Sequence, residues 1–274
     1  MLGVDVQAAA LAAGHEVVAL TRADLDITDA SATTAAVTAA SPDVIINCAA
    51  YTKVDDAEGE GRDAAFAVNG TGPGRLAAAA VEASAWIVHV STDYVFDGTK
   101  TSGPYLETDP VNPRSVYGAS KLQGEQALAQ AAPESHTIVR SSWLFGNHGP
   151  CFPGTMLRLA GERDSLSVVD DQRGCPTFTP DLAQSLLTLA AQRSLGVVHV
   201  AGGGECTWFE FARETVALAG LNAVVSPCTT ADFPRPAARP AYSVLRSGRS
   251  DAPVQRDWRE GLRSYLEAIP VPAP

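Results

Sequence analysis

The sequence holds few cysteines and no pattern that would pair them. The five are Cys48, Cys151, Cys175, Cys206 and Cys228, an odd number, and no two form a C-x-x-C pair. This spacing argues against a disulfide framework or a zinc knuckle and fits reduced thiols in a cytoplasm. The five histidines show no metal-ligand spacing either, and no acidic cluster stands out. We therefore expect no metal site.

Long apolar runs and a positively charged start with an apolar segment behind it are also missing. The sequence thus predicts neither a membrane span nor a secretory signal, and we expect a cytoplasmic protein. The formal net charge is -11, which argues against nucleic acid or an anionic membrane as the main partner. With 274 residues, 46% of them hydrophobic, the chain can bury a large core.

What is present is an alternation of short apolar runs with alanine-rich amphipathic stretches. Predicted strands are Val17–Leu20, Val44–Asn47, Trp86–Val90, Thr137–Arg140 and Val197–Val200; predicted helices lie near Ala30–Ala40, Thr71–Ala83, Ser115–Ala131 and Pro180–Ala191. This order predicts an α/β fold with a Rossmann-like, doubly wound parallel sheet covered on both faces.

The pattern loosens after about residue 141, where loops rich in Gly and Pro appear. We expect residues 1–145, completed by about 180–202, to form the sheet domain. Residues 146–179 and 203–274 would form a smaller C-terminal substrate-binding lobe. Ligands of such sheets bind beyond the carboxyl ends of the strands, so the chemistry is expected in the turns that follow them.

Tyr117 and Lys121 are the first candidates for that chemistry. They lie four positions apart at the start of a predicted helix and therefore share a face. A nearby ammonium favours the phenolate and lowers the pKa of a tyrosine, so the pair could exchange a proton with a carbonyl/alcohol couple. An exposed surface pair explains the spacing about equally well.

Two further strand ends carry polar or aromatic residues. Thr92 follows the apolar run Trp86–Val90, and Trp143 follows Thr137–Arg140. Taken alone, each has a plainer explanation, as turn chemistry or as an aromatic between two lobes. Together with Tyr117 and Lys121 they indicate one site.

In these stretches the sequence resembles the extended short-chain dehydrogenase/reductases, and among them the dTDP-4-dehydrorhamnose reductase family. The resemblance is carried by STDYVFDG, ETDPVNPRSVYGASK, RSSWLFG, DLDITD, PDVIINCAAYT, VDDAE, DQRGCPT and RPAYSVL, in the family's order and over nearly the whole chain. It implies reduction of the nucleotide sugar dTDP-4-dehydro-β-L-rhamnose to dTDP-β-L-rhamnose.

The resemblance also implies roles for individual residues. Tyr117 would protonate the C4 carbonyl oxygen, Lys121 would hold the nicotinamide ribose, and Thr92 would polarise the carbonyl. Asp93 and Trp143 would contact the substrate. Cofactor contacts would come from Met1, Leu2, Gly3, Asp26, Ile27, Ala49, Ala50, Tyr51 and Val90, besides Tyr117 and Lys121.

The cofactor preference depends on Arg22. Thr21 and Arg22 directly follow the run Val17–Leu20, with no acidic residue there. An acid at this place would hold a ribose 2′-hydroxyl, whereas an arginine can meet a 2′-phosphate. We therefore expect NADPH, with NADH as the alternative. A solvated turn explains Arg22 nearly as well. The resemblance leaves a homodimer open.

The start of the chain departs from the family pattern. Members begin with a strand and the turn G-x-x-G-x-L-G, and only Met1, Leu2 and Gly3 match its end. We favour a Met1 that is internal to a longer product over a truncation that has lost cofactor binding. As given, the sheet should expose a strand edge or a gap at its centre, and the chain should be poorly stable.

Two other functions stay open. Another NDP-4-keto-6-deoxyhexose reductase would use the same catalytic residues, because only the substrate lobe would differ. Some relatives of this fold are regulatory subunits without activity of their own, although intact Tyr117, Lys121 and Thr92 speak against that function here.

Overall fold

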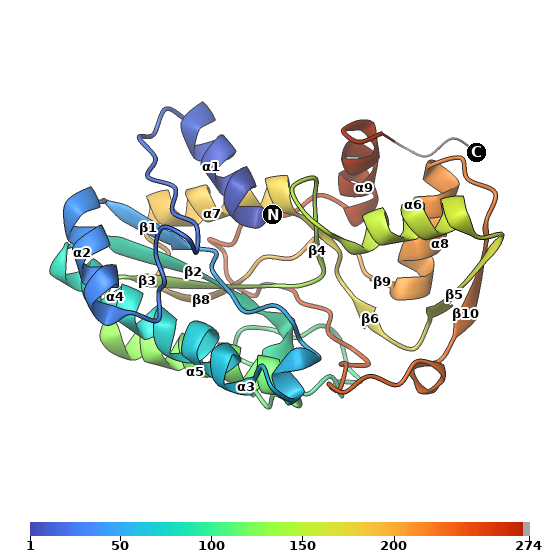
Figure 1. Cartoon of the computed structure of the whole chain (residues 1–274), viewed down its shortest axis with the longest axis horizontal. Coiled ribbons are helices and arrows are strands. Elements are labelled where there is room, and N and C mark those ends of the chain that lie inside the picture. The colour runs from blue at the N-terminus through green and yellow to red at the C-terminus, as the bar shows by residue number, and fades with distance from the viewer. Residues whose placement is uncertain (271–274) are drawn as a thin grey trace.

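The computed structural model describes residues 1–270 and is built around a parallel sheet of four strands (Figure 1). The strands are β1 (Val44–Asn47), β2 (Trp86–Thr92), β3 (His136–Ser141) and β8 (Gly196–His199), in the order β1-β2-β3-β8. Their register places Asn47 beside His89 and Thr92 beside Ser141. Residues that follow these strands therefore meet at one edge of the sheet.

Helices cover both faces of this sheet, as Figure 1 shows. Ile87 and Ile138 pack against α4 (Gly72–Glu82) and α5 (Val116–Ala131), and α2 (Ala30–Ala40) lies outside α4. Val88 and Val139, one position further along their strands, pack against α1 (Leu2–Ala12) and α7 (Thr179–Gln192). This alternation follows from the two-residue period of a strand, and it explains why the runs are apolar throughout.

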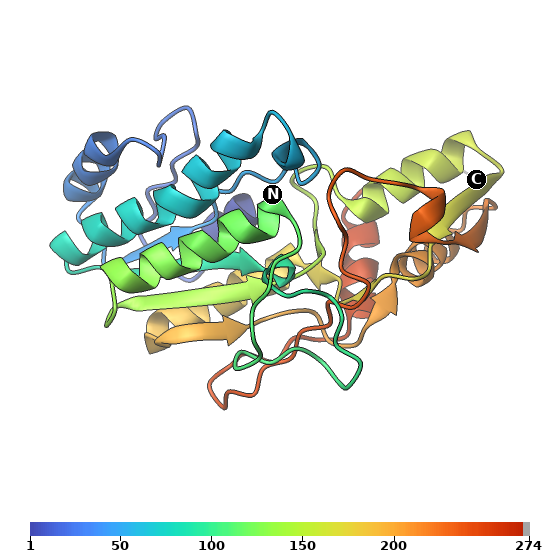
Figure 2. The same cartoon turned by 90° about the horizontal axis from the view of Figure 1, so that it is seen from below.

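A second group of elements lies beside the sheet (Figure 2). Its helices are α6 (Phe152–Glu162), α8 (Trp208–Leu218) and α9 (Trp258–Glu267). Its strand pairs are β5 (Ser165–Val169) with β10 (Val224–Cys228), β4 (Leu144–Phe145) with β7 (Thr177–Phe178), and β6 (Arg173–Gly174) with β9 (Cys206–Thr207). An aromatic cluster that includes Phe145, Phe178, Phe211, Trp258 and Tyr265 forms its core.

Short helical segments line the loops between the main elements. They are η1 (Asp56–Glu58), α3 (Arg62–Ala65), η2 (Phe66–Thr71, a π-helix), η3 (Asp93–Val95) and η4 (Thr230–Asp232). Within residues 1–270, no helix combines the length and the apolar composition needed to cross a membrane.

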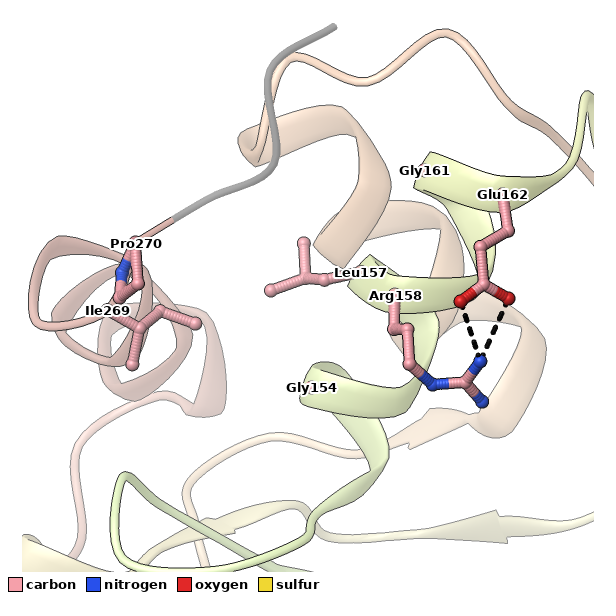
Figure 3. Close-up of a pocket in the computed structure, with 7 residues that line it drawn as sticks. All are labelled: Gly154, Leu157, Arg158, Gly161, Glu162, Ile269 and Pro270. Carbon is pink, nitrogen blue, oxygen red and sulfur yellow. Dashed lines mark hydrogen bonds and ion pairs between the residues drawn. The ribbon is translucent and has the colours of Figure 1, made fainter.

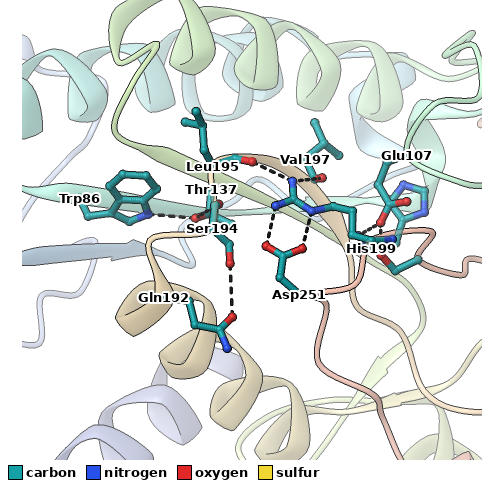
Figure 4. Close-up of polar contacts among 11 residues, drawn as sticks. Trp86, Glu107, Thr137, Gln192, Ser194, Leu195, Val197, His199 and Asp251 are labelled. Carbon is teal, nitrogen blue, oxygen red and sulfur yellow. Dashed lines mark hydrogen bonds and ion pairs between the residues drawn. The ribbon is translucent and has the colours of Figure 1, made fainter.

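Polar contacts tie the C-terminal segment to β8, which is an edge strand. Arg249 donates to the carbonyl oxygens of Leu195 (2.7 Å) and Val197 (3.1 Å) and pairs with Asp251. Nearby, the His199 amide donates to Glu107 at 2.8 Å, as Figure 4 shows. Arg249 thus satisfies backbone carbonyl oxygens, and Glu107 satisfies a backbone amide, that an unpaired strand edge would leave open.

The predicted fold class is confirmed, and four of the five predicted strands form within two residues of their expected ends. The strand predicted at Val17–Leu20 is wrong, because this segment has no regular structure and leaves Val18 60% and Leu20 49% exposed. A strand needs a neighbour to pair its backbone groups, and no strand of residues 1–270 is paired with this segment.

Candidate active site

Tyr117 and Lys121 enter the site from the first two turns of α5. Ser115 caps this helix, since its hydroxyl accepts a hydrogen bond from the Gly118 amide at 3.1 Å. Gly118 lets the helix approach η3 closely: a Cβ at this position would lie only 2.2 Å from the Tyr94 carbonyl oxygen. The helix start is thereby fixed against the carboxyl end of β2.

Lys121 is buried against β2. Its Nζ lies 2.6 Å from the Val90 carbonyl oxygen and 3.2 Å from His89 Nε2, and only 2% of the residue is exposed. Burial lowers the pKa of Lys121 to about 8, although the Glu125 carboxylate acts in the opposite direction. Val90, which was expected to contact the cofactor, thus also fixes the lysine.

Tyr117 is half-buried one turn earlier on the same helix. Burial raises the pKa of Tyr117 to about 12, and a hydrogen bond with the Thr92 hydroxyl reduces the effect. The expectation that Lys121 lowers the pKa of Tyr117 is therefore wrong. The reason is that burial dominates and that Val90 and His89 hold the Lys121 nitrogen.

Thr92 and Asp93 complete the cluster at the end of β2. The Thr92 hydroxyl donates to Asp93 Oδ1 at 3.0 Å and accepts from the Tyr94 amide at 3.3 Å, which caps η3. Asp93 is 2% exposed. Its burial raises the pKa of Asp93 to about 6, against hydrogen bonds from Ser243 and Thr92 that lower it.

Trp143 follows β3 at the same edge of the sheet. Its backbone has a positive φ of 49°, and its ring stacks on Trp208, with centroids 3.5 Å apart and planes 6° from parallel. Gly174 packs closely on the ring, since a Cβ there would lie 2.5 Å from Trp143 Cε2. Trp208 therefore covers one ring face, and a sugar can meet only what remains of the Trp143 surface.

The start of α1 lies near this cluster. A Cβ on Gly3 would lie 3.8 Å from Cys48 Cβ, and the chain's N-terminal amine and Lys121 both act on the Cys48 thiol. No side chain caps α1, so its first amides are free to meet an anion.

Other residues expected to contact the cofactor flank the same space. Ala49 and Ala50 are exposed, and Asn69 holds the backbone of Tyr51 through bonds of 2.8 and 3.0 Å. These features fit a dinucleotide. The free amides of α1 and the exposed residues after β1 suit its pyrophosphate, and the buried lysine suits its nicotinamide ribose.

Arg22, Asp26 and Ile27 lie further from this cluster. Asp26 accepts hydrogen bonds from the Thr28 amide (2.9 Å) and hydroxyl (2.7 Å), which lower the pKa of Asp26. Ile27 is buried against the start of α4, where a Cβ on Gly72 would meet it at 2.7 Å. Arg22 is exposed and favours the charged form of Asp26.

Several buried polar residues at the site were not predicted from the sequence. Asn47 and His89 connect to Lys121, and the Ser91 hydroxyl, Glu125 and Arg140 form a buried network beneath it. Their only local signal is position: Asn47 ends one strand, and His89 precedes Thr92 on the next. Among residues 1–270, no group of three or more His, Cys, Asp or Glu side chains is placed to hold a metal ion.

A surface pocket lies between α6 and the end of α9, away from these residues. It is lined by Gly154, Leu157, Arg158, Gly161, Glu162, Ile269 and Pro270, and its charged side chains pair with each other (Figure 3). None of the residues predicted from the sequence lines it.

Comparison with known proteins places the chain among close relatives. The family model described as RmlD substrate binding domain matches residues 1–270. The chain belongs to this family. A dTDP-4-dehydrorhamnose reductase of Streptomyces griseus is 42% identical over 100% of this chain and 94% of the relative. A dTDP-4-keto-6-deoxy-D-glucose reductase of Streptomyces niveus is 44% identical over 89% of this chain and 85% of the relative.

A solved structure of the same family extends the comparison to three dimensions. The dTDP-4-dehydrorhamnose reductase of Bacillus anthracis, determined in complex with NADP, has a TM-score of 0.94 and 37% identity. The superposition covers 98% of this chain and 95% of the B. anthracis chain. The RmlD family fold is therefore present throughout the described chain.

Proposed function

We propose that this chain is an oxidoreductase that reduces dTDP-4-dehydro-β-L-rhamnose to dTDP-β-L-rhamnose with NADPH. The observation that carries the proposal is the cluster of Tyr117, Thr92 and Lys121 at the carboxyl end of β2. It supplies a proton donor, a hydroxyl for the carbonyl oxygen and a buried lysine at one place. Reductases at about 40% identity over nearly the full chain support the substrate class.

The residues of the cluster would divide the reaction between them. A bound nicotinamide, with its ribose held by Lys121, would supply a hydride to C4 of the sugar. The carbonyl oxygen would take a proton from the Tyr117 hydroxyl, which would yield the alcohol and leave a phenolate. A Tyr117 pKa of about 12 keeps the phenol protonated at neutral pH. The Thr92 hydroxyl would hydrogen-bond the same oxygen, and Lys121 as an ammonium would stabilise the phenolate.

NADPH is the proposed cofactor, with NADH as the alternative. The B. anthracis relative was determined with NADP, and Arg22 is exposed beside the segment that follows α1. An arginine so placed can pair with a 2′-phosphate. Met1, Leu2, Gly3, Ala49, Ala50, Tyr51, Asp26 and Ile27 are the further proposed cofactor contacts.

The remaining assignments belong to the same proposal. Asp93 and Trp143 would contact the sugar nucleotide. Residues 146–179 and 203–274 would form the substrate-binding lobe beside the sheet domain of residues 1–145 and about 180–202. A homodimer and a cytoplasmic location complete the proposal.

The first experiment is NADPH oxidation with dTDP-4-dehydro-β-L-rhamnose, measured for the unsubstituted chain and for Tyr117→Phe. We expect the variant to lose about 10²- to 10⁴-fold in kcat, because the proton donor is gone. Tyr265→Phe is the matched control, since it removes a buried tyrosine hydroxyl that contacts Cys151 and none of the three cluster residues. A Tyr117→Phe enzyme with unchanged kcat would overturn the mechanism.

A second candidate substrate is dTDP-4-keto-6-deoxy-D-glucose, because the S. niveus relative is named for it. The same catalytic residues would serve, so the two candidates differ only in how the sugar is held. Measuring kcat/KM for both nucleotide sugars under one set of conditions decides between them. A higher value for the glucose derivative would transfer the assignment to that substrate.

A further inference from the structure

A chain of buried hydrogen bonds runs from the end of β1 to Lys121. The Ala49 amide lies 3.0 Å from Asn47 Oδ1, Asn47 Nδ2 lies 3.0 Å from His89 Nδ1, and His89 Nε2 lies 3.2 Å from Lys121 Nζ. Asn47, His89 and Lys121 are 4%, 0% and 2% exposed. The residues that carry these contacts are far apart in sequence and meet because β1 and β2 are paired.

The first bond of this chain fixes the orientation of all the others. A backbone amide can only donate, so the atom of Asn47 that faces Ala49 is the carbonyl oxygen. The amide nitrogen of Asn47 then faces His89 and donates to Nδ1, which must be unprotonated. Burial holds the pKa of His89 well below its usual value, so the ring is neutral. Its single proton is therefore on Nε2.

This tautomer directs an N–H group of His89 at the Lys121 nitrogen. An ammonium has three donors and no acceptor, so two donors would face each other at 3.2 Å. A neutral amine has one lone pair, which can accept from His89 while an N–H donates to the Val90 carbonyl at 2.6 Å. The arrangement thus favours the neutral form of Lys121.

We propose that Asn47 and His89 are positioning residues that set the protonation state of Lys121, by selecting the histidine tautomer whose N–H faces the lysine. Lys121 then releases its proton more readily than an ordinary lysine does. It takes a proton back from solvent when an acceptor, such as a ribose hydroxyl or a phenolate, enters the site. The tautomer follows from the contacts alone, and only the role of Lys121 rests on the proposed function.

Other ionisable groups that face Lys121 leave this argument intact. Glu125 on α5 favours the ammonium, but its carboxylate is already paired with Arg140 of β3 through bonds of 2.9 and 2.7 Å. Burial raises the pKa of Cys48 to about 12, so this thiol is neutral. Tyr117 is a neutral phenol, and η2, which packs on α5, carries no ionisable side chain.

The tautomer can be read directly by nitrogen NMR of the full chain labelled with ¹⁵N-histidine. The chain supplies its own references, because His136 Nδ1 lies 2.7 Å from the Ala132 carbonyl and His199 Nδ1 lies 3.0 Å from the Arg246 carbonyl. A carbonyl only accepts, so both of these buried rings carry their proton on Nδ1. The exposed His15 and His148 are removed as His15→Gln and His148→Gln.

At about pH 8 we expect one buried histidine with its proton on Nε2 and two with theirs on Nδ1, and the His89 signal should stay unchanged between about pH 6 and 9. Three rings with the proton on Nδ1, or an imidazolium signal for His89, would overturn the proposal. This readout needs no turnover, so it stands or falls separately from the proposed reaction.

The consequence for catalysis is tested by the pH profile of kcat/KM for the unsubstituted chain, His89→Gln and the buried control His136→Gln. A glutamine can turn its carbonyl oxygen toward Lys121, so the lysine should keep its proton to higher pH. We expect the alkaline limb of His89→Gln to move up by about one pH unit or more, and that of the control to stay. An equal loss at every pH, with an unmoved midpoint, would mean that His89 serves only the structure.

Discussion

Glu125 and Arg140 form an ion pair beneath the site whose side chains are only 4% and 5% exposed. Arg140 donates to both carboxylate oxygens, and the Ser91 hydroxyl donates to one of them. Removing one partner would leave a buried charge without compensation, so we expect Glu125→Ala to lower the free energy of unfolding by about 3–5 kcal/mol. Urea unfolding followed by circular dichroism measures this change.

The control for this prediction is an exposed pair of the same type. Arg158 and Glu162 lie one turn apart on α6 at 2.9 Å, with side chains 60% and 52% exposed. Glu162→Ala should change the free energy of unfolding by less than about 0.5 kcal/mol. Equal urea midpoints for the two alanine variants would show that the buried pair contributes no more to stability than the exposed one.

At the residue scale, the sequence predicted what local spacing encodes and missed what tertiary contacts decide. Tyr117 and Lys121 could be paired because four positions along a helix bring side chains to one face. Asn47 and Lys121 stand 42 and 32 positions from His89. Only the pairing of β1 with β2 and the packing of α5 bring the three together. Within its apolar run, His89 therefore looks like an ordinary core residue.

At the element scale, Trp143 is held between β6 and the start of α8. A Cβ at Gly174 would lie 2.5 Å from the ring, so Gly174→Ala must displace Trp143 from its stack on Trp208. If Trp143 contacts the sugar, KM for the nucleotide sugar should rise about tenfold while the Kd of NADPH stays unchanged. Steady-state kinetics and fluorescence titration with NADPH measure the two effects.

Gly248→Ala is the matched control, because the nearest atom to its new Cβ is a Glu107 carboxylate oxygen at 3.9 Å. This variant should keep the KM of the unsubstituted enzyme. A Gly174→Ala enzyme with an unchanged KM for the sugar would show that Trp143 does not position the substrate.

Two apolar segments of the chain show that composition alone does not predict a strand. Val44–Asn47 and Val17–Leu20 have the same apolar character, yet only the first is a strand. Val44–Asn47 has β2 to pair with, whereas Val17–Leu20 has no neighbouring strand among residues 1–270. Apolar composition therefore identifies segments that can become strands, and the presence of a partner decides which of them do.

At the scale of the whole molecule, the stability of the chain should depend on pH through Asp93. Burial raises the pKa of Asp93 from 3.8 to about 6, so the folded chain binds a proton more tightly than the unfolded chain does. The stabilisation from this proton is present below about pH 4 and is lost as the pH rises through 6. A shift of this size corresponds to about 3 kcal/mol at pH 8.

Asp93→Asn cannot ionise and should therefore be more stable than the unsubstituted chain at pH 8, by about 3 kcal/mol, and equally stable near pH 4. Asp251 provides a control of opposite sign, because hydrogen bonds from Arg249 lower the pKa of Asp251 to about 2. Its stabilisation is present above about pH 4, so Asp251→Asn should be less stable than the unsubstituted chain at pH 8. Scanning calorimetry at the two pH values measures both differences. A lower Tm of Asp93→Asn than of the unsubstituted chain at pH 8 would contradict a raised pKa of the buried Asp93 carboxylate.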